Sequence, residues 1–73
     1  MMSHKYRILC PNVMWIRDSL PGDPCNLDSL EGAMRLAKLA AKAATEYGDY
    51  LIFEVGKDQP AGRFQMVQLV EDE

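Results

Sequence analysis

One long amphipathic segment, residues 29–47, constrains the fold of this chain more than any other feature. Asp28 precedes it and stands three residues before Glu31, which is the capping-box spacing of a helix start. Gly48 follows it, and glycine readily takes the left-handed conformation with which many helices end. The sequence therefore predicts one helix over about 29–47, with Asp28 as its N-cap and Gly48 as its terminating residue.

The segments on both sides of this helix have the patterns of strands. Residues 4–10 and 13–17 alternate between two faces around the turn-forming Pro11-Asn12, and they predict either a short hairpin or one bent strand. Residues 50–55 and 64–70 predict two more strands joined by a turn region over 57–62. The predicted fold class is α+β with the order ββαββ: a two-layer sandwich in which the helix packs on one face of an antiparallel sheet.

The length of 73 residues allows one small domain with frayed termini. No apolar run approaches the roughly 18 residues that a membrane span needs, so we expect no membrane contact. The first residues, MMSHKY, lack the apolar core of a signal peptide, and Cys10 and Cys25 are too few for a secreted disulfide scaffold. These observations favour a cytoplasmic protein, and they leave open a single bridge between the two cysteines.

The apolar side of the predicted helix is wider than one sheet can cover. It spans an arc of roughly 220°, about twice what a helix lying on one sheet needs. Alanines fill the middle of the arc, at positions 33, 37, 40 and 44, and small side chains let a helix lie close to a sheet. If the sheet covers these alanines, Leu39 lies near solvent. Leu36, Leu39 and Ala43 are therefore the candidate protein interface, with a boundary position for Leu39 as the alternative.

The polar side of the helix carries a charged strip. Glu31 and Arg35, and likewise Lys42 and Glu46, have the four-residue spacing of helical ion pairs, whereas Lys38 lacks such a partner. A solvated helix face explains the strip. The alternative is a nucleic-acid contact through Arg35, Lys38 and Lys42.

The overall charge disfavours nucleic acid as the main partner. The chain has eight basic and eleven acidic residues, and without the C-terminal Glu71, Asp72 and Glu73 the body is neutral. A sheet face that the helix leaves uncovered would change this expectation if it carried aromatic side chains beside Arg7 and Arg17. Trp15 and Tyr50 are the candidates for such a face, and the competing interpretation places Trp15 and Phe53 in the core.

No residue pattern in the chain predicts catalysis. His4 is the only histidine, and it stands too far from Cys10 along a strand to form a dyad with it. Neither a metal-ligand spacing nor a glycine-rich phosphate loop is present in the sequence, so we expect no catalytic, metal or cofactor-binding residues. An enzyme or ligand domain that becomes complete only as an oligomer stays an open alternative.

Residues 20–33 contain a turn and a helix start at a recognisable spacing. Leu20-Pro21-Gly22 is followed by five residues and then by Asp28-Ser29-Leu30-Glu31-Gly32-Ala33. This stretch resembles the amino-terminal domain of HicB-type antitoxins, in which Leu-Pro-Gly precedes a helix that opens with Asp-Thr-Leu-Glu-Glu-Ala. Gly32 departs from that pattern because it replaces a helix-favouring residue. The resemblance implies a protein that neutralises a partner, and it transfers no functional residue to this chain.

Taken together, the residues favour a small non-enzymatic regulatory module that acts through protein–protein contact or self-association, including a homodimer. The alternatives are a weak nucleic-acid-binding domain and an antitoxin-like or mobile-element-encoded inhibitor.

Overall fold

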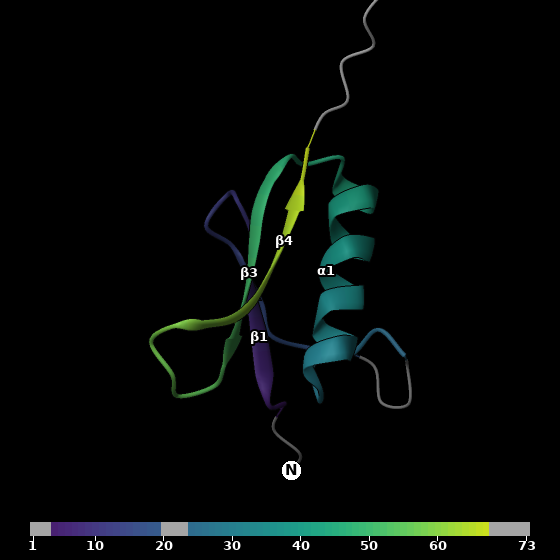
Figure 1. Ribbon diagram of the computed structural model, residues 1–73. Helices are drawn as coiled ribbons and strands as arrows, with labels where there is room; N and C mark the ends of the chain where they lie inside the picture. Colours follow the sequence, from purple (N-terminus) through teal and green to yellow (C-terminus); the bar gives the residue numbers. More distant parts are fainter. Residues whose placement is uncertain (1–3, 20–23, 68–73) are drawn as a thin grey trace, which may run out of the picture.

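A computed structural model describes residues 4–19 and 24–67 of the chain. Its elements follow the predicted ββαββ order and form an α+β sandwich, with the helix on one side of the sheet (Figure 1). The five elements are β1 (Tyr6–Leu9), β2 (Trp15–Ile16), α1 (Leu30–Ala44), β3 (Gly48–Glu54) and β4 (Pro60–Met66).

The sheet has the strand order β2-β1-β3-β4, and each neighbouring pair is antiparallel. The first two strands form the hairpin rather than one bent strand, because the chain reverses after β1. In that turn the Cys10 N–H donates to the Met14 carbonyl at 2.8 Å, and the Val13 N–H donates to the Cys10 carbonyl at 2.9 Å. Val13 takes the left-handed conformation at φ 66°, which closes the reversal.

The helix is shorter than predicted at both ends. Its N-cap is Ser29, not Asp28: the Ser29 hydroxyl accepts from the Gly32 N–H at 3.0 Å, while the Asp28 carboxylate contacts Nδ1 of His4. At the other end Thr45 takes the left-handed conformation at φ 48°, so the predicted terminator Gly48 instead begins β3. The chain leaves the helix early because β3 must start at Gly48 to reach its full pairing with β4.

The strand boundaries also differ from the prediction. β1 and β2 are shorter than 4–10 and 13–17, and β4 begins at Pro60 rather than at residue 64. The register of β3 with β4 shifts between positions 52 and 53 of β3. Ile52 pairs with Gly62, whereas Phe53 pairs with Pro60, and this irregularity accommodates the early start of β4. Residues 68–70 of the predicted last strand, the acidic tip 71–73 and the Leu-Pro-Gly turn at 20–22 lie outside the described residues.

The core lies between α1 and the two central strands. It consists of Ile8, Leu27, Ala33, Ala37, Ala41, Tyr50 and Ile52, each at most 1% exposed. The helix is turned slightly from the predicted orientation: Ala41 joins the core, whereas Ala40 is half-buried and Ala44 is exposed. With this orientation α1 lies close to β4, and a Cβ on Gly62 would stand 3.1 Å from Cδ1 of Leu30. A glycine in β4 therefore leaves room for the first turn of the helix.

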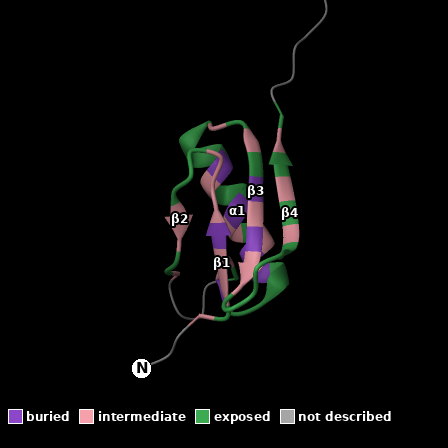
Figure 2. Ribbon diagram, turned by 90° about the vertical axis from the view of Figure 1, so that its left-hand side faces the viewer, coloured by how far each residue is buried: buried purple, intermediate pink, exposed green. Residues whose placement is uncertain are grey.

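Only one face of the sheet is covered by the helix. α1 packs against β1, β3 and β4 on that face, and none of the described elements lies over the other face, which Figure 2 shows from the front. Cys10 and Cys25 are not joined by a disulfide. Within the described part of the chain, no helix is long and apolar enough to cross a membrane.

Candidate functional site

The uncovered face of the sheet carries more positive than negative charge. Ile8, Tyr50 and Ile52 are buried on the face that meets the helix. Because side chains alternate along a strand, the odd-numbered residues of β1 and β3 lie on the opposite face, and so do their cross-strand partners. This set, with Arg17 just after β2, has three arginines and a single carboxylate among the described strand positions. Its members are Arg7, Leu9, Trp15, Arg17, Asp49, Leu51, Phe53, Arg63 and Gln65.

An arginine lies against two aromatic rings that contact each other on this face. The rings of Trp15 and Phe53 meet edge to face, with centroids 5.5 Å apart. The guanidinium carbon of Arg7 lies 4.4 Å from the centroid of the Trp15 ring and 5.9 Å from that of Phe53. The register explains the cluster, because Arg7 pairs with Phe53 on β3 and stands diagonally to Trp15 on β2. Nε of Arg7 is buried and has no hydrogen-bond partner among the described residues.

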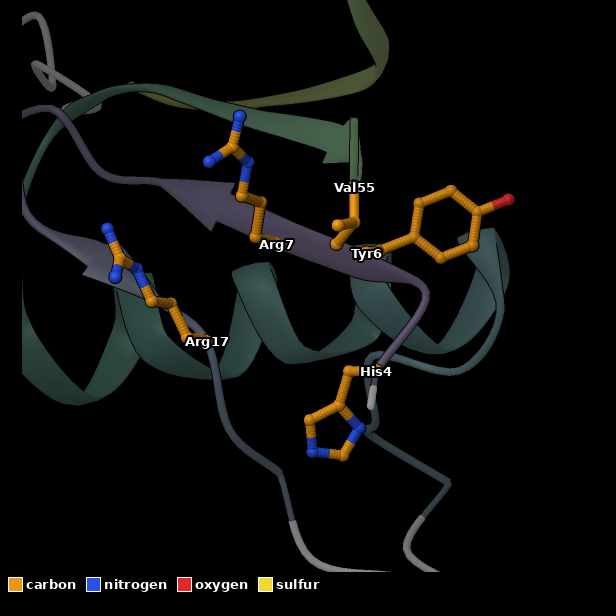
Figure 3. A pocket seen from close by; sticks show the side chains of 5 residues that line it. All are labelled: His4, Tyr6, Arg7, Arg17 and Val55. Carbon is orange, nitrogen blue, oxygen red and sulfur yellow. The ribbon is translucent and has the colours of Figure 1, made fainter. Parts of the chain in front are cut away.

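A pocket of about 280 Å³ adjoins this cluster at the end of the sheet. Arg7, Arg17, His4, Tyr6 and Val55 line it, and in Figure 3 the Arg7 and Arg17 side chains extend in the same direction. Arg17 directly follows Ile16, the last residue of β2, which pairs with Ile8. Among the described residues neither arginine has an ion-pair partner, so two unpaired positive charges line the pocket.

His4 forms a fixed wall of this pocket. Its Nδ1 donates to the Asp28 carboxylate at 3.1 Å, and its Nε2 accepts from the Ser19 N–H at 3.3 Å. The neutral ring with its proton on Nδ1 satisfies both contacts. Ser19 in turn accepts from the Leu27 N–H through its hydroxyl. Both ring nitrogens are occupied by structural bonds, so His4 positions the loop and is not a free base.

A second hollow of about 210 Å³ lies between the hairpin and the C-terminal half of α1. Its lining is mostly apolar and includes Met14, Ile16, Ala40 and the Cys10 thiol. Burial, and secondarily the carboxylate of Glu46, raises the pKa of the Cys10 thiol. The thiol is therefore held in its protonated form and is a poor nucleophile. This hollow offers apolar surface and no reactive group.

The predicted protein interface lies on the outer side of α1. Leu39 is 55% exposed, as the alanine face predicted, and Ala43 is exposed as well. Leu36 is half-buried and packs against the core. The structure thus leaves Leu39 as the only large, strongly exposed apolar side chain of the three.

The predicted basic strip is exposed but is not a continuous positive surface. Arg35 donates to Glu31 at 2.9 Å, which confirms that pair. The predicted Lys42–Glu46 pair is wrong, because the Glu46 carboxylate accepts from the backbone N–H of Asn12 in the β1–β2 turn. The third cation, Lys38, has its ammonium nitrogen 5.8 Å from the centroid of the Phe64 ring. Compared with the open face of the sheet, the basic strip of the helix therefore has fewer free cations and no pair of contacting aromatic rings.

Two sequence interpretations of the aromatic residues are overturned. Trp15 and Phe53 are half-buried on the open face and do not belong to the core. Tyr50, which was a candidate for that face, is 1% exposed in the core, where its hydroxyl donates to the Glu46 carbonyl. The sequence did not predict Phe53 and Arg63 on the open face. Their face depends on the register of β3 with β4, and alternation within a single strand does not show which of its two faces meets the helix.

Comparison of the chain with protein-family models, with curated proteins and with solved structures finds no match. Within residues 4–19 and 24–67, no group of three or more His, Cys, Asp or Glu side chains is arranged to hold a metal ion.

Proposed function

We propose that this protein is a binding module that takes single-stranded nucleic acid on the open face of its sheet. The observation that carries the proposal is the stack of Arg7 with Trp15 and Phe53 on a sheet face that no described element covers. The proposal keeps the expected class of a non-enzymatic module. It moves the nucleic-acid contact from the helix strip to the sheet.

Unstacked bases bind to flat aromatic or guanidinium surfaces, and both are present on this face. Single-stranded nucleic acids stack their bases on aromatic rings and on arginine planes, and each stacked base contributes about 1–3 kcal/mol. The guanidinium carbon of Arg7 lies 4.4 Å from the centroid of the Trp15 ring, so an arginine and two aromatic rings stand together on this face as surfaces for stacking.

Local charge supports the proposal despite the net charge of −3. Arg7, Arg17 and Arg63 share the face with one carboxylate, Asp49. Electrostatic attraction is screened within about 10 Å at 0.1 M salt, so a strand on this face responds mainly to the nearby arginines. If all three contact phosphates, the logarithm of the binding constant should fall with the logarithm of salt concentration with a slope of about −2.

Trp15 provides a direct measurement because it is the only tryptophan in the chain. A mixed-sequence single-stranded octamer should quench the Trp15 fluorescence through stacking, and fluorescence anisotropy of a labelled octamer should give the same binding curve. Duplex of the same sequence should bind more weakly, since its bases are not available for stacking.

Two charge reversals distinguish the sheet face from the helix strip. Arg63→Glu and Lys42→Glu change the net charge equally, and both residues are exposed. We expect Arg63→Glu to weaken octamer binding about tenfold at 50 mM salt and Lys42→Glu to change it less than twofold. Equal losses for the two variants would assign the binding to overall charge, and loss only in Lys42→Glu would move the site to the helix. Absence of binding at 50 mM salt would refute the proposal.

A second candidate function, protein contact through the outer side of α1, has one observation in its favour. Leu39 is 55% exposed on the side of the helix away from the sheet, next to exposed Ala43 and half-buried Leu36. If this surface mediates self-association, Leu39→Glu should abolish it while leaving the far-ultraviolet circular dichroism unchanged. Association that survives this substitution excludes the surface.

A further inference from the structure

We propose, on the basis of the nucleic-acid function above, that the pocket between Arg7 and Arg17 receives a terminal phosphate. The protein would then prefer single strands that carry a phosphate monoester at one end. Four properties of the pocket lead to this assignment: its two arginines, the restrained guanidinium of Arg7, its volume and its position.

The paired arginines are the first property. The side chains of Arg7 and Arg17 both line the pocket and extend in the same direction (Figure 3). Like charges that stand close together repel each other. Among the described residues no carboxylate lines the pocket, and neither arginine has an ion pair. A bound anion would attract both arginines and so offset the repulsion between them.

The donor geometry is the second property. Arg7 is restrained by its contacts with Trp15 and Phe53, so its guanidinium is already positioned before a ligand arrives. A phosphate oxygen is a strong acceptor that forms short, charge-assisted hydrogen bonds with guanidinium groups. The restrained arginine would lose little side-chain freedom on binding.

Volume and position are the third and fourth properties. The pocket volume of about 280 Å³ is roughly nine times the liquid volume of one water molecule, which is room for a phosphate and part of a sugar. The pocket lies where β1 begins and β3 ends, between His4 and Val55. A strand that stacks on Trp15 and Phe53 at the centre of the face therefore reaches the pocket at the margin of the sheet, where a chain end fits.

The charge of the ligand favours a terminal phosphate of a strand over an internal phosphate. A phosphate monoester carries about −1.5 to −2 at pH 7, whereas each internal phosphodiester carries one negative charge. Two adjacent arginines interact more favourably with the monoester. We expect a phosphorylated octamer to bind about five to ten times more tightly than the same octamer with hydroxyl ends at 50 mM salt.

The test compares three octamers of one sequence, with a 5′-phosphate, with a 3′-phosphate, or with hydroxyl groups at both ends. Wild type should prefer one phosphorylated octamer, and the preferred end reports the direction of the strand. Arg17→Gln should remove the preference. Arg63→Gln is the matched control, because it removes an exposed arginine from the same face outside the pocket, and it should weaken all three octamers while keeping the preference.

A further arm separates this inference from the proposed function. Inorganic phosphate should raise the melting temperature of wild type more than that of Arg17→Gln. Equal binding of all three octamers overturns the terminal-phosphate site and leaves strand binding intact. Stabilisation by phosphate without octamer binding keeps the anion site and overturns the nucleic-acid function. Absence of both responses overturns both proposals.

Discussion

Replacing Gly32 with alanine tests whether tertiary contact overrides helix propensity in this protein. Alanine is favoured over glycine in a helix by about 0.8–1.0 kcal/mol, so propensity alone predicts a more stable variant. In the folded chain, however, Gly32 is buried, and a Cβ there would stand 2.7 Å from Oδ1 and 2.8 Å from the backbone oxygen of Asn26. The side chain of Asn26 can move only by giving up its hydrogen bond from the Asp28 N–H. Its backbone oxygen cannot rotate away.

The balance favours destabilisation. Overpacking costs about 1–3 kcal/mol, and a lost hydrogen bond costs about 1 kcal/mol more. Against the propensity gain, the free energy of unfolding of Gly32→Ala should fall by about 1–3 kcal/mol, which lowers the melting temperature by roughly 4–24 °C in a chain of this size.

Chemical denaturation followed by circular dichroism measures this change. The matched control is Ala43→Gly, because Ala43 is an exposed position of the same helix. It should lose only the propensity difference of about 1 kcal/mol. Alanine should therefore be the better residue at position 43 and the worse one at position 32. A Gly32→Ala variant that is more stable than wild type would refute the close approach of the helix start to Asn26.

Three further predictions concern titration, the helix surface and the hairpin. The pKa of Tyr50 is raised by burial, then by the Glu46 carboxylate and the Cys10 thiol. The unfolded chain therefore loses this proton first, so stability should decline as the pH rises past about 10, and Tyr50→Phe should flatten that decline in pH-dependent melting. Leu39→Glu should change the free energy of unfolding by less than about 0.5 kcal/mol by urea titration, since Leu39 is mostly exposed. A larger loss would mean that Leu39 supports the core. Gly48→Ala should destabilise by about 1–3 kcal/mol, because Gly48 has φ 131° and a Cβ would stand 2.9 Å from Cβ of Pro11. Wild-type stability in that variant would rule out the contact.

The sequence determined the order and types of the elements. Local patterns carry this information: a segment with apolar residues at helical spacing and two pairs of alternating segments leave one simple sandwich. The same periodicity predicted the burial of Ala33 and Ala37 and the exposure of Leu39, whereas it placed Ala40 and Ala44 in the covered face, where Ala40 is half-buried and Ala44 is exposed. The confirmed part needs only the relation between neighbouring positions on one element.

The tertiary structure decided the ends of the helix. Asp28 and Ser29 are both suitable caps, and the choice fell to Ser29 because His4, far along the chain, contacts the Asp28 carboxylate. Thr45 closes the helix in a conformation that glycine prefers, because the pairing of β3 with β4 requires Gly48 in the strand. Where two residues have a similar propensity to cap or end a helix, only contacts between distant segments decide which one does so.

The candidate site was also decided by tertiary structure. The sequence offered Trp15 or Tyr50, beside Arg7 and Arg17, as an alternative for an uncovered face, and its competing interpretation placed Trp15 and Phe53 in the core. Alternation separates the two faces of each strand without saying which face meets the helix. That choice depends on register, since a shift of one residue exchanges the faces of an entire strand. Pairing between β1, β2 and β3 brings Arg7, Trp15 and Phe53 together, and this pairing is a non-local property of the folded chain.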